Sequence, residues 1–257
     1  MGSERWSKLN SLQGDLPPGL LASAGWLRRK GYSDQLLRKY KQSGWLEGPA
    51  RGVYRRPGLP LKWQSVVASL AREMKKPPHI GGISALEQQG RAHYVPLGNR
   101  QLYLYGEERF PPWVDALPGL RPFIFKHDTL FSPSQRAGLD VLRWGESSWE
   151  LPISTLERAY LEVLDEAIFG ALEHERLLLD GLASLRPGLL TDLLEDCRSI
   201  KVKRLFLALA ARVNHAWFDR LDLARVKLGS GKRAFAKDGI LDKRFLITLP
   251  RDIDDRY

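Results

Sequence analysis

Hydrophobic positions in the first quarter of the chain follow helical spacing in three places and alternate with polar ones in two others. The helical spacing predicts helices over residues 4–12, 21–30 and 34–42. The alternating stretches, residues 45–47 and 53–55, flank a break rich in Gly and Pro and predict a hairpin. Helix, short turn, helix and hairpin is the order of elements in a winged helix-turn-helix.

The third expected helix has two distinct faces. Ser33 is its expected N-cap, with Asp34 in the first turn. Leu36, Leu37 and Tyr40 form an apolar side that is expected to pack. The opposite side carries polar residues at positions i, i+3, i+4 and i+7, which are Gln35, Arg38, Lys39 and Gln42.

This polar face suits the major groove of DNA. A helix is about 10–12 Å across and the groove about 12 Å wide, so residues of its N-terminal half reach base edges. Gln35 is expected to read adenine and Arg38 guanine. Phosphate contacts are expected from Arg28, Arg29, Lys39, Lys41, Arg51, Arg55 and Arg56, and Ser33 and Tyr54 complete the DNA-binding set. A solvated basic face on a protein-docking winged helix stays open as an alternative.

Charge is unevenly distributed and supports the DNA interpretation. The chain carries 40 Lys and Arg against 30 Asp and Glu, a net charge of +10. Residues 1–62 hold 12 basic and 4 acidic side chains, and residues 201–257 hold 14 basic and 7 acidic ones. The middle part, residues 63–200, holds 14 basic and 19 acidic side chains, so both ends are basic and the middle is acidic. Clustered cations favour a polyanionic partner, because binding releases counterions.

A domain boundary is expected at residues 57–60, where two prolines and a glycine disfavour regular structure. The fold class is therefore α+β, with a winged helix-turn-helix over residues 1–60 and a larger mixed α/β C-terminal domain over 61–257. Ser154 and Glu157 predict a capping box at the start of one helix of that domain. The other helices are expected at residues 63–75, 171–185, 189–197 and 202–214, and strands at 101–105, 122–126, 139–144, 225–228 and 244–248.

The glycine-rich stretch 229–233 resembles a nucleotide-binding loop only in part. A Walker pattern needs a glycine where the chain has Val226 and a Ser or Thr where it has Arg233. A tight turn with exposed cations is the favoured interpretation, and it adds a second basic surface.

Catalytic and metal-binding signatures are missing from the sequence. The five histidines are scattered without zinc spacing, and the stretch around Ser84 departs from a nucleophile elbow at Leu86. We therefore expect no enzyme, no cofactor and no metal. The alternative is a winged-helix-guided nuclease-like enzyme, in which Asp128, Asp140, Glu157 and Glu162 would have to converge on a metal.

The number of cysteines and the lengths of the apolar runs indicate the cellular compartment of the protein. The single cysteine, Cys197, makes no intramolecular disulfide and is expected to be a small buried hydrophobe. The most apolar run, residues 205–211, is far below the roughly 20 residues of a membrane span. A soluble, cytoplasmic protein is expected.

Several separated stretches occur in an order found in a known family. They are SGWLE at 43–47, RGVY at 51–54, GGISALE at 81–87, HYVPLG at 93–98, ERA at 157–159, VKRLFL at 202–207 and LGSGKR at 228–233. On these residues the chain resembles the AbiEi family of antitoxins from type IV toxin-antitoxin systems, from about residue 20 to about residue 250.

The resemblance implies a two-domain antitoxin without catalytic activity. Its winged helix would repress its own operon by binding inverted repeats in the double-stranded promoter DNA. Its C-terminal domain would counter a nucleotidyltransferase toxin without forming a stable complex. The resemblance also permits a second nucleic-acid contact, inferred from charge, on a C-terminal basic surface made of Lys201, Lys203, Arg204, Lys227, Lys232 and Arg233.

Overall fold

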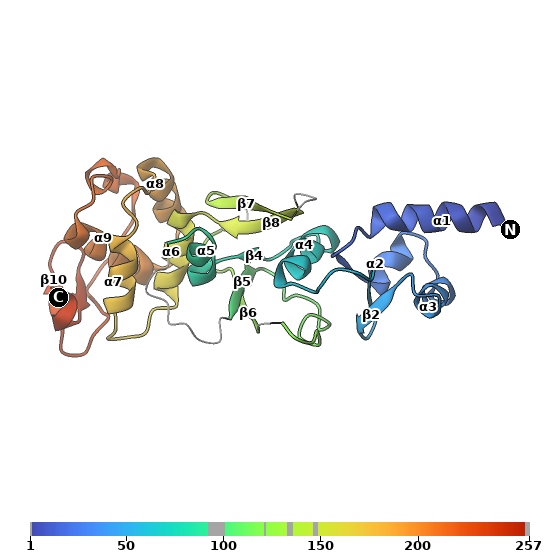
Figure 1. Cartoon of the computed structure of the whole chain (residues 1–257). Helices are drawn as coiled ribbons and strands as arrows, with labels where there is room; N and C mark the ends of the chain where they lie inside the picture. The colour runs from blue at the N-terminus through green and yellow to red at the C-terminus, as the bar shows by residue number, and fades with distance from the viewer. Residues whose placement is uncertain (1, 92–100, 121, 133–135, 146–148, 255–257) are drawn as a thin grey trace. The chain divides into compact units, whose positions relative to one another are not determined.

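The computed structural model describes residues 2–91, 101–120, 122–132, 136–145 and 149–254 (Figure 1). Contacts divide the chain into two compact units. The first unit holds Met1–His79, Asn99–Phe125 and Val141–Pro152, and the second holds Ile80–Gly98, Lys126–Asp140 and Ile153–Tyr257. The boundary expected at residues 57–60 stays a prediction.

Three helices and a small sheet form the N-terminal part of the first unit. The helices are α1 (Gly2–Asp15), α2 (Ala24–Arg29) and α3 (Asp34–Gln42), and the strands are β1 (Leu21–Ser23), β2 (Glu47–Ala50) and β3 (Val53–Arg55). The strands are antiparallel in the order β1-β3-β2. The expected bounds of the third helix and the expected hairpin are confirmed.

The second helix is shorter than its sequence pattern indicates. Residues 21–23 were expected to be helical, but they pair with β3, Leu21 opposite Arg55 and Ser23 opposite Val53. Ser23 then caps α2, because its Oγ accepts a hydrogen bond from the backbone N–H of Trp26 at 3.1 Å. A third strand and a capping residue therefore occupy what the apolar spacing alone assigned to one helix.

Helix α4 (Trp63–Glu73) contacts strand β1 through hydrogen bonds that are buried or partly buried. The backbone N–H of Leu21 donates to Ser69 Oγ at 2.8 Å. The carboxylate of Glu73 accepts from both the backbone N–H and the hydroxyl of Ser23, each at 2.7 Å. Burial raises the pKa of Glu73, although these two hydrogen bonds oppose that shift. Helix α4 thus holds the start of α2 in place.

Gly19 is required where the segment before β1 meets Trp149. Its φ is +86°, and a Cβ at this position would lie 2.6 Å from the Trp149 ring. Gly14, near the end of α1, has no atom within 4 Å of an added Cβ.

We expect Gly19→Ala to destabilise the protein by about 1–3 kcal/mol, from left-handed strain and overpacking. Gly14→Ala is the matched control and should be neutral or stabilising by up to about 1 kcal/mol, because alanine favours a helix. Chemical denaturation of both variants measures the difference. Equal midpoints would contradict the packing of Gly19 against Trp149.

A five-stranded sheet has the order β6-β5-β4-β8-β7. Its strands are β4 (His79–Ile80), β5 (Leu102–Gly106), β6 (Phe123–His127), β7 (Leu139–Trp144) and β8 (Trp149–Ser154). The expected strands at 101–105, 122–126 and 139–144 are confirmed within one residue at each end. Strands β4 and β8 were not anticipated, and they pair in parallel with Ile80 opposite Ile153.

Five α-helices lie in the described part of the second unit, and the mixed α+β class is confirmed. They are α5 (Gly82–Gln88), α6 (Leu156–Asp165), α7 (Glu173–Asp180), α8 (Pro187–Asp196) and α9 (Ile200–Val213). The core includes residues 202–210 of α9 and 157–164 of α6, all of which are buried. Within the described ranges, no helix combines the length and apolarity needed to cross a membrane.

Two expectations for the second unit are wrong. Residues 225–228 are not a strand: η2 (Leu223–Arg225) is a 3-10 turn, and Arg225 pairs with Asp192 and Glu195. The second expected strand, 244–248, begins later, because β11 (Ile247–Leu249) pairs with β10 (Ile240–Asp242) and β9 (Arg233–Ala234) only from residue 247 on.

Ser154 and Glu157 do not form a capping box. Ser154 is the last residue of β8, and its hydroxyl donates to the Glu162 carboxylate at 2.9–3.0 Å. Helix α6 begins one residue later than expected, with Thr155 as its N-cap. Glu157 instead accepts from the backbone and guanidinium of Arg186. Burial alone would raise the pKa of Glu157, but the hydrogen bonds to its carboxylate, those from Arg186 first among them, together lower that pKa.

Candidate nucleic-acid interface

The turn between α2 and α3 is fixed by three short-range features. Gly31 has φ +86°, a left-handed conformation that favours glycine. Tyr32 is buried, and its hydroxyl donates to Asp15 Oδ2 at 2.8 Å. Burial, followed by this bond to Asp15, raises the pKa of Tyr32. Ser33 Oγ accepts from the Leu36 N–H at 3.2 Å, so the predicted N-cap of α3 is confirmed.

Helix α3 has the two faces expected from its sequence. Leu37 and Tyr40 are buried, and Leu36 is half-buried. The other face is exposed, and it presents Gln35, Arg38, Lys39 and Gln42 together with Lys41. In the described part of the chain, neither Arg38 nor Lys39 has a carboxylate partner. The helix therefore offers hydrogen-bonding groups and three exposed cations, Arg38, Lys39 and Lys41, to an outside partner.

The remaining N-terminal cations differ in how available they are. Arg29 is exposed, and Arg51 is exposed at the tip of the β2–β3 hairpin beside Gly52, whose φ is +73°. Arg28 is exposed too, but its guanidinium lies 3.2 Å from the Asp34 carboxylate. A phosphate would compete with that carboxylate for Arg28.

Arg55 and Tyr54 lie at the base of the hairpin. The Arg55 guanidinium lies 2.7 Å from the Glu47 carboxylate and donates to the Leu59 carbonyl at 2.9 Å. Its side chain is only 17% exposed, and Tyr54 is half-buried. In this structure Arg55 connects β3 to β2 and to the segment that follows β3.

The C-terminal basic surface is smaller than expected. Lys227, Lys232 and Arg233 are exposed. Lys201 is half-exposed, and its ammonium donates to the Asp165 carbonyl at 2.7 Å. Lys203 and Arg204 are buried, at 4% and 0% exposure, because both satisfy backbone carbonyls inside the second unit. Their expected place on an exposed surface is wrong.

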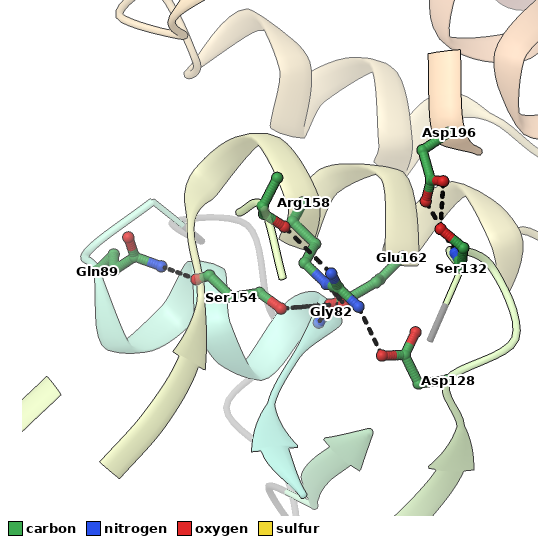
Figure 2. A network of polar contacts seen from close by, with 9 residues as sticks. Gly82, Gln89, Asp128, Ser132, Ser154, Arg158, Glu162 and Asp196 are labelled. Atoms are coloured by element: carbon green, nitrogen blue, oxygen red, sulfur yellow. Dashed lines mark hydrogen bonds and ion pairs between the residues drawn. The ribbon is translucent and has the colours of Figure 1, made fainter. Parts of the chain in front are cut away.

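A buried ionic network connects α6 to three other segments of the second unit (Figure 2). Arg158 and Glu162, one helical turn apart, form an ion pair at 3.0 Å, with both side chains 1% exposed. Arg158 also donates to Asp128 at 2.6 Å, and its guanidinium lies 4.4 Å from the centre of the Phe131 ring. The carboxylate of Glu162 accepts from the backbone N–H of Gly82 at 2.8 Å.

Neighbouring residues complete this network. Gln89 donates to the Ser154 carbonyl at 3.0 Å, and Ser132 donates to Asp196 through its N–H at 2.8 Å (Figure 2). Gly138 has φ +71°, and a Cβ there would lie 2.8 Å from Cβ of Arg158. The network therefore joins α5, the end of β8 and the 128–138 segment to α6 through the Arg158–Glu162 pair.

Three of the four carboxylates considered for a metal-dependent nuclease bind arginines instead, and the fourth lies at the surface. Asp128 and Glu162 both bind Arg158, Glu157 binds Arg186, and Asp140 is exposed. Among the residues that the structure describes, no group of three or more His, Cys, Asp or Glu side chains could hold a metal ion. Ser84 is buried in the first turn of α5. Cys197 is buried as expected, and burial raises its pKa to about 11.

Sequence reasoning missed the Arg158 network and the contact between Ser23 and Glu73. Arg158 and Glu162 do have a local signal, opposite charges four residues apart on an apolar helix. The partners Asp128, Ser23 and Glu73 have none, because their contacts join segments 30–50 residues apart.

Family models match nearly the whole chain. Residues 5–97 match the model described as "Transcriptional regulator, AbiEi antitoxin N-terminal domain". Residues 99–250 match "Transcriptional regulator, AbiEi antitoxin, Type IV TA system". These two matches place the chain in the class of antitoxins that are transcriptional regulators. The chain belongs to the AbiEi antitoxin family of type IV toxin-antitoxin systems, as the sequence resemblance indicated. Its HYVPLG stretch lies outside the described residues.

The fold is also found in a solved structure. The crystal structure of the RV2827C protein from Mycobacterium tuberculosis matches with a TM-score of 0.57 and 19% sequence identity, over 93% of this chain and 88% of that one. At that identity the likeness supports the fold alone. Comparison with curated proteins gave no match.

Proposed function

We propose that this antitoxin represses its own operon by binding promoter DNA through a winged helix-turn-helix. Helix α3 would enter the major groove, and the β2–β3 hairpin would be the wing. The observation that carries the proposal is the division of α3, with Leu37 and Tyr40 buried while Gln35, Arg38 and Lys39 are exposed. A helix presented in this way can approach base edges without unfolding.

The roles of the contacts follow from their chemistry. Gln35 and Arg38 have bidentate side chains that match adenine and guanine edges, so they would select sequence. Exposed cations would bind phosphates and set affinity, namely Arg28, Arg29, Lys39, Lys41 and Arg51. Arg55 would act mainly through the shape of the wing, since Glu47 and Leu59 already occupy its guanidinium. Inverted repeats would be bound by two copies of the chain, because each copy presents one α3.

The second part of the proposal concerns the toxin. We infer that the C-terminal part of the chain counters a nucleotidyltransferase toxin without forming a stable complex. Family membership supports this role. The second unit also has its own core and its own ionic network, so its fold would not require α3. Repression and neutralisation would then be separable by mutation.

A promoter-reporter assay tests both parts. Expression of the chain should lower output from a reporter driven by the chain's own upstream DNA. The variant Arg38→Ala/Lys39→Ala should lose this repression but still rescue cells that express the cognate toxin. Loss of rescue along with repression, at unchanged protein level, would contradict the separation. Full repression by the variant would contradict the role of α3.

A further inference from the structure

Arg204 is a buried cation that holds an exposed loop from beneath. Its side chain is fully buried, and its guanidinium donates to four backbone carbonyls. Nε donates to Leu228 at 3.0 Å, one terminal nitrogen donates to Gly231 at 2.7 Å and Leu246 at 2.8 Å, and the other donates to Gly229 at 3.3 Å. Three of these carbonyls belong to the loop 228–233.

The charge of Arg204 is not neutralised by a carboxylate in the described ranges. Burial and the nearby positive charge of Arg233 lower the pKa of Arg204. Lys232 and Arg233 are exposed on the loop above it, and the described residues supply neither with an acidic partner. A buried charge balanced only by dipoles is costly, and an external anion would reduce that cost.

The backbone of the loop is oriented to receive such an anion. Within a peptide group, the C=O and the following N–H point in opposite directions. Because the carbonyls of 228, 229 and 231 point toward Arg204, the N–H groups of Gly229, Ser230 and Lys232 point away from it. No described residue accepts a hydrogen bond from these N–H groups. Glycines with φ +67° and +72° at 229 and 231 permit this arrangement.

We propose that the loop 228–233 binds a phosphoryl oxyanion on its outer face. That face offers donors and positive charge: backbone N–H groups, the Ser230 hydroxyl, the Lys232 ammonium and the Arg233 guanidinium. Arg204 is a positioning residue, which turns the carbonyls inward and adds its charge from below. The phosphoryl group could belong to a nucleic-acid backbone or to a free nucleotide. The proposal concerns the second unit and does not depend on α3.

Amide chemical shifts of the ¹⁵N-labelled full chain test the site. The chain would be titrated separately with inorganic phosphate, ATP and a short DNA duplex. We expect saturable shifts at Gly229, Ser230 and Lys232 with at least one of these probes. Lys232→Ala/Arg233→Ala should weaken that binding about tenfold. The control Arg220→Ala/Lys243→Ala removes the same two kinds of exposed cation elsewhere in the unit and should bind normally.

The three probes distinguish the possible sources of the phosphoryl group. Shifts with ATP or phosphate would identify a free phosphoryl ligand, and shifts with the duplex alone would identify backbone phosphate. Retention of the duplex response at the loop amides in Arg38→Ala/Lys39→Ala would show that the loop binds independently of α3. No shift with any probe, or equal weakening in the control, would overturn the proposal.

Discussion

Replacing Arg158 with Met should lower the free energy of unfolding by about 3–5 kcal/mol. This is the largest effect on stability that we expect from a single substitution in this chain. Glu162 is 1% exposed and would lose the guanidinium that balances its charge. Asp128 would lose its 2.6 Å contact as well. Methionine fills similar volume, so the loss would come from uncompensated carboxylates rather than from a cavity.

Urea denaturation followed by circular dichroism measures this cost. Arg143→Met is the matched control, because Arg143 is exposed on β7 and should change stability by less than about 0.5 kcal/mol. A loss of less than about 1 kcal/mol in Arg158→Met would show that the network of Figure 2 contributes little to the fold.

The second large effect is on DNA affinity. Arg38→Ala/Lys39→Ala should weaken binding to the chain's own upstream DNA by about 2–4 kcal/mol, roughly 30- to 1000-fold. Both side chains are exposed on α3 and lack a described carboxylate partner, so truncating them should leave the fold intact. Each lost phosphate contact should also reduce the salt slope by about 1.

A control variant tests whether the position of the removed cations matters, or only the loss of two positive charges. Arg220→Ala/Lys243→Ala removes one Arg and one Lys far along the sequence from α3, and should retain affinity within about threefold. Equal loss in both double variants would indicate binding to overall positive charge, and α3 would not be a recognition helix.

Local pattern predicted the N-terminal elements well, and the reason is physical. Helix α3 carries its own cap at Ser33 and its own apolar face, so local sequence sets both its bounds and its orientation. The hairpin is fixed by Gly52 in the same local way. The candidate DNA-binding face could therefore be predicted from sequence, while its contact with DNA stays a proposal.

Long-range partners account for the failures. Residues 21–23 form a strand only because β3 lies beside them, and Ser154 is not an N-cap because the buried Glu162 accepts its hydroxyl. Arg204 was placed on a basic surface because a sequence gives its charge but not the four carbonyls that bury it. In each case a tertiary contact outweighed a local preference.

Helix α4 bears on how the N-terminal part should be isolated for experiments. Its Ser69 and Glu73 hold β1 and the start of α2, although α4 follows the boundary expected at residues 57–60. A fragment ending at residue 60 would lose both contacts. We therefore base every DNA-binding test on the full chain.

The most direct test is the affinity of the full wild-type chain for a duplex of its own upstream DNA, measured at two salt concentrations beside a scrambled duplex. The account predicts tighter binding to the native duplex at both concentrations, with affinity falling as salt rises. Equal affinity for the two duplexes, or no binding at low salt, would contradict it.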